Sequence, residues 1–86
     1  MADPITRVDE RTWRWDDGGP YFCEARISPD GDTVHLYEGP KSEAAQRHEG
    51  GGNSYPRRGF PGNVHQGWKT RWPGLCEAVA EGLASP

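Results

Sequence analysis

The residues best suited to binding chemistry lie between Glu49 and Glu77, in a stretch that contains no carboxylate. Arginine presents a planar set of donors to phosphate and carboxylate groups. Aromatic rings stack on nucleic-acid bases or fill pockets of a protein partner. Because both residue types are interleaved here, the segment 55–72 is predicted to bind a partner. The residues expected to form this surface are Tyr55, Arg57, Arg58, Phe60, His65, Lys69 and Arg71.

Within this surface, Arg57 and Arg58 are expected to make the charged contacts, and Tyr55 and Phe60 to serve as outward-facing apolar anchors. The surrounding segment 50–63 holds five Gly, two Pro and no aliphatic residue, which predicts a long, exposed and flexible loop. Loops beyond about 12 residues in a compact domain are usually functional or disordered. The loop is therefore the first candidate for function in this chain.

An alternative interpretation assigns the same residues to structure, with Trp68 and Trp72 in the core and the arginines paired to distant acids. For the tryptophans the sequence favours this interpretation. Residues 1–40 carry nine acidic and four basic side chains, and residues 41–72 carry two acidic and six basic ones. The acidic half is a second candidate surface, which could meet a basic protein. Its residues are Asp9, Glu10, Asp16, Asp17, Glu24, Asp30, Asp32 and Glu38.

The charge distribution favours a small non-enzymatic protein that engages a protein partner, as an accessory or inhibitor encoded by a phage or mobile element. A nucleic-acid-binding module that uses the 55–72 segment is the first alternative. The formal net charge of −3 opposes it, because specific nucleic-acid modules are usually strongly basic. The second alternative is the subunit of a structural homo-oligomer, whose exposed sheet edge or tryptophan would complete its core.

Catalytic, metal and cofactor motifs are missing from the sequence, so no enzyme activity, metal site or cofactor is expected. There is no pair of cysteines or histidines at zinc-ligand spacing, and no phosphate-cradling glycine motif. A dyad of Cys23 and His35 would require a strand register that places both on one face. Cys23 and Cys76 are interpreted as small buried hydrophobic residues, with a disulfide between them as the alternative.

The 86 residues are enough for a single domain. Residues 1–9 are polar and acidic, which predicts a loose N-terminal arm and not a signal peptide. No apolar run approaches the roughly 20 residues of a membrane span, so no membrane partner is expected. A cytoplasmic location follows as the default expectation.

Periodicity predicts the elements that must position the candidate surface. Alternation predicts strands over 10–16, 21–28 and 33–38, and Pro29-Asp30-Gly31-Asp32 is a turn between the last two. Short helices are expected at 42–48 and from Pro73 onward, where Leu75, Val79 and Leu83 recur every four residues. The segment 67–72 fits both a helix and a strand, and Gly67 and Pro73 favour the strand. The fold class is therefore α+β, with a three- to four-stranded antiparallel sheet and one C-terminal helix on one face.

Overall fold

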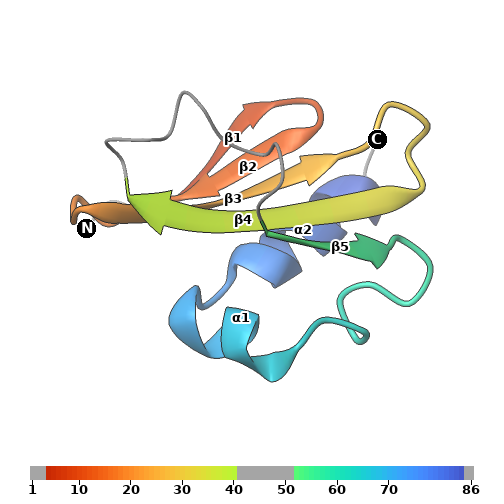
Figure 1. Cartoon of the computed structure of the whole chain (residues 1–86). Coiled ribbons are helices and arrows are strands. Elements are labelled where there is room, and N and C mark those ends of the chain that lie inside the picture. The colour runs from red at the N-terminus through yellow and green to blue at the C-terminus, as the bar shows by residue number, and fades with distance from the viewer. Residues whose placement is uncertain (1–3, 41–51, 85–86) are drawn as a thin grey trace.

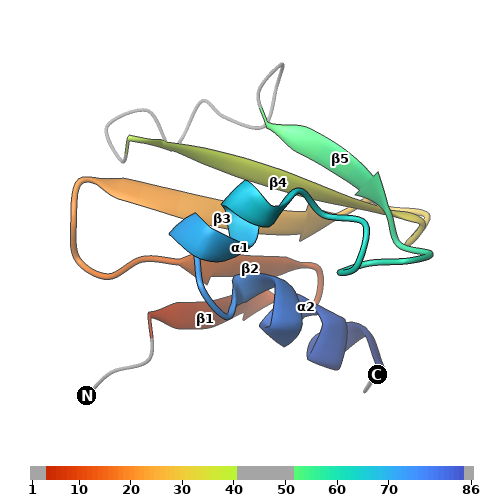
Figure 2. The ribbon, with the colours of Figure 1, turned by 90° about the horizontal axis from the view of Figure 1, so that it is seen from below.

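The computed structural model describes residues 4–40 and 52–84, which form a five-stranded antiparallel sheet and two helices. Each strand pairs with its neighbours in sequence, so the sheet is a simple meander (Figure 1). Seen from below, both helices lie on the same face of the sheet (Figure 2). The strands are β1 (Ile5–Asp9), β2 (Thr12–Trp15), β3 (Tyr21–Ile27), β4 (Thr33–Pro40) and β5 (Asn53–Pro56), and the helices are α1 (Gln66–Arg71) and α2 (Leu75–Ala84).

The β3–β4 hairpin forms as the alternation of its residues predicts. The Gly31 N–H donates to the Ser28 carbonyl at 2.9 Å, and the positive φ of 80° at Gly31 closes the turn. Ala25 faces Leu36 across the strand pair, and both are fully buried under the helices. The hairpin therefore supplies the centre of the core.

The α+β class is confirmed, but the predicted strand count of three to four is wrong. Both additional strands lie in segments that the sequence assigned to an arm and to a loop. β1 forms because Ile5 pairs with Trp15 and packs against the core. β5 is an edge strand that is anchored to the core by one inward-facing residue, Tyr55, which lies opposite Val34. Segments this short show too little alternation to be recognised from sequence.

The strand expected at 67–72 is also wrong, because these residues form α1. The His65 side chain caps the helix by accepting a hydrogen bond from the Gly67 N–H at 3.0 Å. Trp68 and Trp72 then both turn toward the sheet and are buried. This confirms the interpretation that places the two rings in the core.

The helix expected after Pro73 is confirmed as α2, which buries Leu75, Cys76 and Val79. It is not alone on its face, because α1 lies beside it (Figure 2). The helix expected at 42–48 lies outside the described residues. No helix in the described ranges is long and apolar enough to cross a membrane.

Trp13 fixes the position of α2 on the sheet. Its indole is only 3 % exposed, and a Cβ atom built on Gly82 would lie 2.5 Å from a ring carbon. The Arg7 guanidinium also lies 4.6 Å from the centroid of the Trp13 ring. The absence of a side chain at position 82 therefore sets how closely α2 approaches β2.

Replacing Gly82 by Ala is expected to destabilise the protein by about 1–2 kcal/mol. Alanine favours a helix over glycine by about 1 kcal/mol, but overpacking a core costs about 1–3 kcal/mol, and the gain is smaller near a helix end. Urea unfolding should show the loss, and it should shrink when G82A is combined with Trp13→Phe, which makes room. An unchanged or raised stability of G82A alone would contradict the close approach.

Candidate functional site

Arg57 joins three elements, so part of its hydrogen-bonding capacity is already used within the fold. Its guanidinium Nη1 donates to the Gly31 carbonyl at 3.4 Å, and Nη2 donates to the Leu83 carbonyl at 3.3 Å. The Arg57 N–H also donates to the Asp32 carbonyl at 2.8 Å. The Arg57 side chain therefore holds the end of α2 against the β3–β4 turn, although it is still exposed to solvent.

Tyr55 and Phe60 are not the outward-facing anchors that the sequence suggested. Both are half-buried and pack against the main core cluster. The exposed part of the Phe60 ring nevertheless faces a groove along α2. Part of the expected apolar surface therefore survives at Phe60.

Three other members of the predicted surface have different surroundings. His65 serves as the cap of α1. Arg71 forms an ion pair with Glu38, and its guanidinium lies 5.8 Å from the centroid of the Trp72 ring. The stretch between Glu49 and Glu77 contains no carboxylate of its own, but in the fold the Glu38 carboxylate of β4 contacts it at Arg71. Lys69 is half-buried, and no hydrogen bond or ion pair of its side chain is seen within the described part of the chain.

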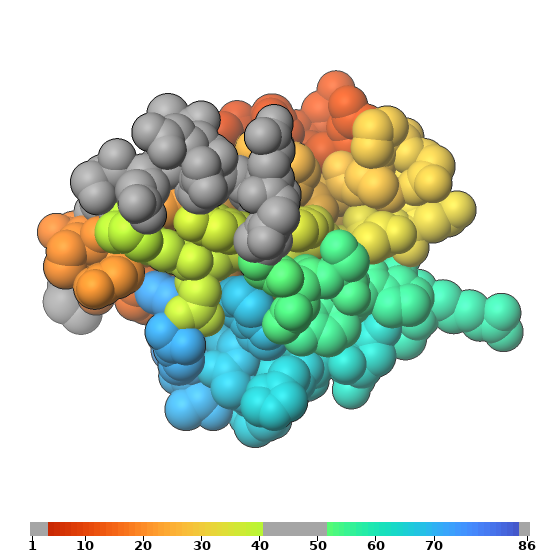
Figure 3. Space-filling model, in the orientation of Figure 1, coloured from red at the N-terminus to blue at the C-terminus, as the bar shows by residue number. Residues whose placement is uncertain are grey.

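The loop after β5 and the last turns of α2 enclose a groove of about 220 Å³, which we call the α2 groove. Its walls are mainly apolar, with the Arg57 guanidinium at the rim. Arg58 follows Arg57 in the chain and is exposed, and no ion pair of its side chain to a described residue is seen. In the space-filling view, the chain that follows β5 projects from the body of the molecule (Figure 3). The groove is lined by Arg57, Phe60, Ala80, Leu83 and Ala84.

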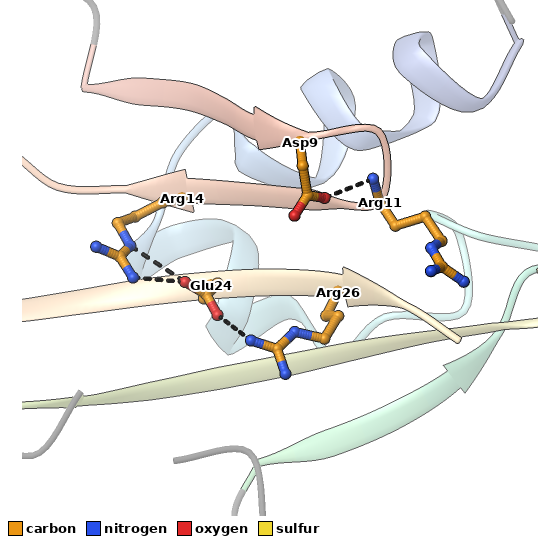
Figure 4. Close-up of polar contacts among 5 residues, drawn as sticks. All are labelled: Asp9, Arg11, Arg14, Glu24 and Arg26. Carbon is orange, nitrogen blue, oxygen red and sulfur yellow. Dashed lines mark hydrogen bonds and ion pairs between the residues drawn. The ribbon is translucent and has the colours of Figure 1, made fainter. Parts of the chain in front are cut away.

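A second charged cluster lies on the sheet face opposite the helices. The carboxylate of Glu24, whose side chain is 6 % exposed, sits between two guanidiniums (Figure 4). Arg14 donates from Nη2 at 2.7 Å and from Nε at 3.2 Å, and Arg26 donates from Nη2 at 3.1 Å. Figure 4 also shows Asp9 accepting from the backbone N–H of Arg11. That hydrogen bond lowers the pKa of the Asp9 carboxyl.

Of this cluster, only Glu24 belongs to a surface predicted from the sequence, the acidic one, although alternation over 21–28 puts Glu24 and Arg26 on one face. The Arg14 guanidinium also lies 5.1 Å from the centroid of the buried Phe22 ring. The signal that could have identified the cluster is a carboxylate flanked by arginines at alternate strand positions. The pairing of Arg14 with Glu24 across β2 and β3 completes it.

The two thiols lie in the core. Cys23 and Cys76 are buried and unpaired, so the disulfide alternative does not apply to this structure. Burial raises the pKa of the Cys23 thiol far above its usual range, and the nearby Glu38 carboxylate adds to this effect. Burial, followed by the charge of Glu77, raises the pKa of the Cys76 thiol to about 11. Both groups therefore remain protonated, unreactive thiols at neutral pH.

The dyad considered for Cys23 and His35 does not form. Cys23 lies opposite Glu38, whereas His35 lies opposite Arg26, so the thiol and the imidazole occupy different faces of the sheet. No group of three or more potential metal-ligating side chains occurs among residues 4–40 and 52–84.

No protein-family model, curated protein or solved structure matches the chain. Function has to be inferred from the two surfaces themselves. They lie on opposite sides of the sheet, with the α2 groove on the helix side and the Glu24 cluster on the open side.

Proposed function

We propose that this chain is a small protein-binding module that acts as an accessory or inhibitor by engaging a protein partner at the α2 groove. One observation carries the proposal: an apolar groove has the exposed guanidinium of Arg57 at its rim, and the exposed Arg58 follows it in the chain. Protein interfaces commonly combine an apolar pocket that takes one anchoring side chain with a polar, solvent-accessible rim. Phe60 and Leu83 supply the pocket, and Arg57 supplies the rim.

The apolar lining of the groove favours a protein partner. The groove has a volume of about 220 Å³, and four of its five lining residues are Phe60, Ala80, Leu83 and Ala84. That volume suits a single apolar side chain presented by a larger surface. The Arg57 guanidinium at its edge, with Arg58 next in the chain, favours an acidic residue next to that side chain in the partner.

The alternative of nucleic-acid binding through the same segment receives less support. Stacking on bases requires exposed aromatic faces, but Trp68 and Trp72 are buried and Tyr55 is half-buried. The Arg71 charge is already paired with Glu38. A mobility-shift assay with oligonucleotides at low salt tests the alternative, and the proposal predicts no shift.

Assembly through the sheet edges is also less supported, because both edges carry features that discourage strand addition. The register of β1 shifts between Arg7 and Asp9, and β5 is four residues long and ends at Pro56. Irregular pairing, short edge strands and proline all oppose edge-to-edge pairing. A sedimentation experiment should therefore find no concentration-dependent association.

Two substitutions test the proposal without disturbing the core. Arg58→Glu reverses the exposed charge, and Ala84→Phe fills the groove from an exposed position on α2. Each is expected to weaken partner binding at least about tenfold, which corresponds to ~1.4 kcal/mol. The measurement is affinity capture from the source cells with the intact chain, followed by calorimetric titration of the captured protein.

Lys69→Glu is the matched control, because it makes the same charge change on α1, away from the groove. It is expected to bind within about twofold of the unmodified chain, since rim charges far from a contact contribute little. Equal weakening by K69E, or full binding by both groove variants, would place the contact elsewhere. Thermal unfolding of every variant separates lost binding from lost folding.

A further inference from the structure

The open face of the sheet carries a row of polar side chains, one from each strand. Strand register places Asp9 opposite Thr12, Thr12 opposite Arg26, Arg26 opposite His35, and His35 opposite Ser54. Side chains that are directly paired across antiparallel strands point to the same face. The meander thus brings together polar groups from opposite ends of the sequence.

A pocket of about 240 Å³ lies over the β3, β4 and β5 part of this row, and we call it the Arg26 pocket. None of the described residues that line it is acidic. On the other side of Arg26, a neighbouring pocket of about 400 Å³ includes Asp9 and Glu10 in its lining. Of these two neighbouring pockets, the Arg26 pocket therefore has the walls better suited to an anion. Its lining residues are Arg26, Ile27, Ser28, Pro29, Thr33, His35 and Ser54.

The charge of Arg26 is not cancelled by its own ion pair. Glu24 is shared between Arg14 and Arg26, so the cluster of two guanidiniums and one carboxylate retains a positive charge. Only Nη2 of Arg26 is held by Glu24, and the side chain is 52 % exposed. The remaining guanidinium donors have no partner among the described residues. Glu24 therefore orients Arg26 while it leaves donors directed outward.

Hydroxyl and imidazole groups complete the pocket. The Nδ1 atom of His35 lies 3.2 Å from the Ser54 hydroxyl, which fixes the two side chains relative to each other. Thr33 adds a second hydroxyl from β4. Ser28 is already engaged, because it donates to Asp30 and accepts from the Thr33 N–H. The polar groups around this space thus come from three different strands.

We infer that the Arg26 pocket binds a phosphate monoester. Arg26 supplies the charge and Thr33 and Ser54 supply hydroxyl groups, while the exposed ring of Pro29 provides an apolar wall for the organic group of the ligand. Donors on three strands match the three terminal oxygens of a phosphoryl group better than the two of a carboxylate. This inference is independent of the α2 groove, because the pocket lies on the opposite face and shares no residue with it.

The test is a titration of the full chain with phenyl phosphate, followed by two-dimensional amide NMR. Dissociation constants in the low millimolar range or tighter are expected, with shifts concentrated at residues 26–29, 33–35 and 54. Inorganic phosphate should bind more weakly because it lacks the organic group, and phenol should not shift these amides. If inorganic phosphate binds equally well, the apolar wall plays no part and the assignment to a monoester is wrong.

Arg26→Gln and Arg14→Gln form the matched pair. Both arginines contact Glu24, but only Arg26 lines the pocket, so R26Q is expected to lose at least about tenfold in affinity and R14Q less than threefold. Equal losses, or no saturable shift in the unmodified chain, would overturn the inference. Both variants are first compared with the unmodified chain by thermal unfolding. If either is unfolded, Ser54→Ala, on the exposed edge strand, decides the question by its own loss of affinity.

Discussion

Replacing Trp13 by Ala is expected to lower the free energy of unfolding by about 3–5 kcal/mol. Trp13 lies on β2 opposite Ala25, is 3 % exposed, and touches Gly82 of α2. Its removal would leave a cavity between the sheet and the helix that neither can close, because α2 is held by other buried residues such as Val79. Domains of this kind are stable by only about 5–15 kcal/mol, so the variant would be largely unfolded at moderate urea concentrations.

Tyr21→Ala is the matched control for this prediction. Tyr21 is an aromatic residue on the neighbouring strand β3, but it is 57 % exposed, so its loss should change stability by less than about 0.5 kcal/mol. Urea unfolding followed by circular dichroism measures both variants. A similar loss for the two would mean that Trp13 does not occupy the centre of the packing between β2 and α2.

Replacing Gly52 by Ala should destabilise the protein by about 2–5 kcal/mol, for two separate reasons. Gly52 has a φ of 76°, and a side chain in the left-handed region costs about 1–2 kcal/mol. In addition, its Cβ would lie 2.1 Å from the Leu36 carbonyl oxygen on β4, and crowding of this kind costs about 1–3 kcal/mol. The β4–β5 pair would have to separate at this point.

Gly18→Ala distinguishes the two contributions. Gly18 also has a positive φ, of 95°, but a Cβ built there meets no atom within 4 Å. G18A should therefore lose only the backbone cost of about 1–2 kcal/mol. Chemical denaturation of both variants tests the difference. A G52A variant no less stable than G18A would show that the Leu36 carbonyl can move aside at little cost in free energy.

Local periodicity was enough to predict the β3–β4 hairpin and α2. Alternation put Ala25 and Leu36 on the buried face, and the four-residue spacing of Leu75 and Val79 defined the buried side of α2. The same reasoning failed at α1, because Trp68 and Trp72 satisfy both a helical and a strand period. What decides between them is the His65 cap, together with the sheet surface that receives both rings.

The candidate sites depend on contacts between distant segments, which periodicity does not contain. The guanidinium of Arg57 binds carbonyl oxygens of Gly31 and Leu83, each 26 residues away in sequence. Likewise, Arg71 meets Glu38 only because α1 lies beside the end of β4. The polar row on the open face required the register of all the strands. A binding surface predicted from residue types alone therefore includes arginines and aromatic rings that already have contacts within the fold.

The order of the meander has a consequence for how the protein acquires its structure. Since every strand pairs with its neighbour along the chain, the sheet can grow hairpin by hairpin through contacts of short loop length, which favours rapid folding. The helices that cover it come after all five strands in sequence. During synthesis, the apolar face of the nascent sheet would therefore stay exposed to solvent until α2 leaves the ribosome. In this interval the chain is most prone to aggregation.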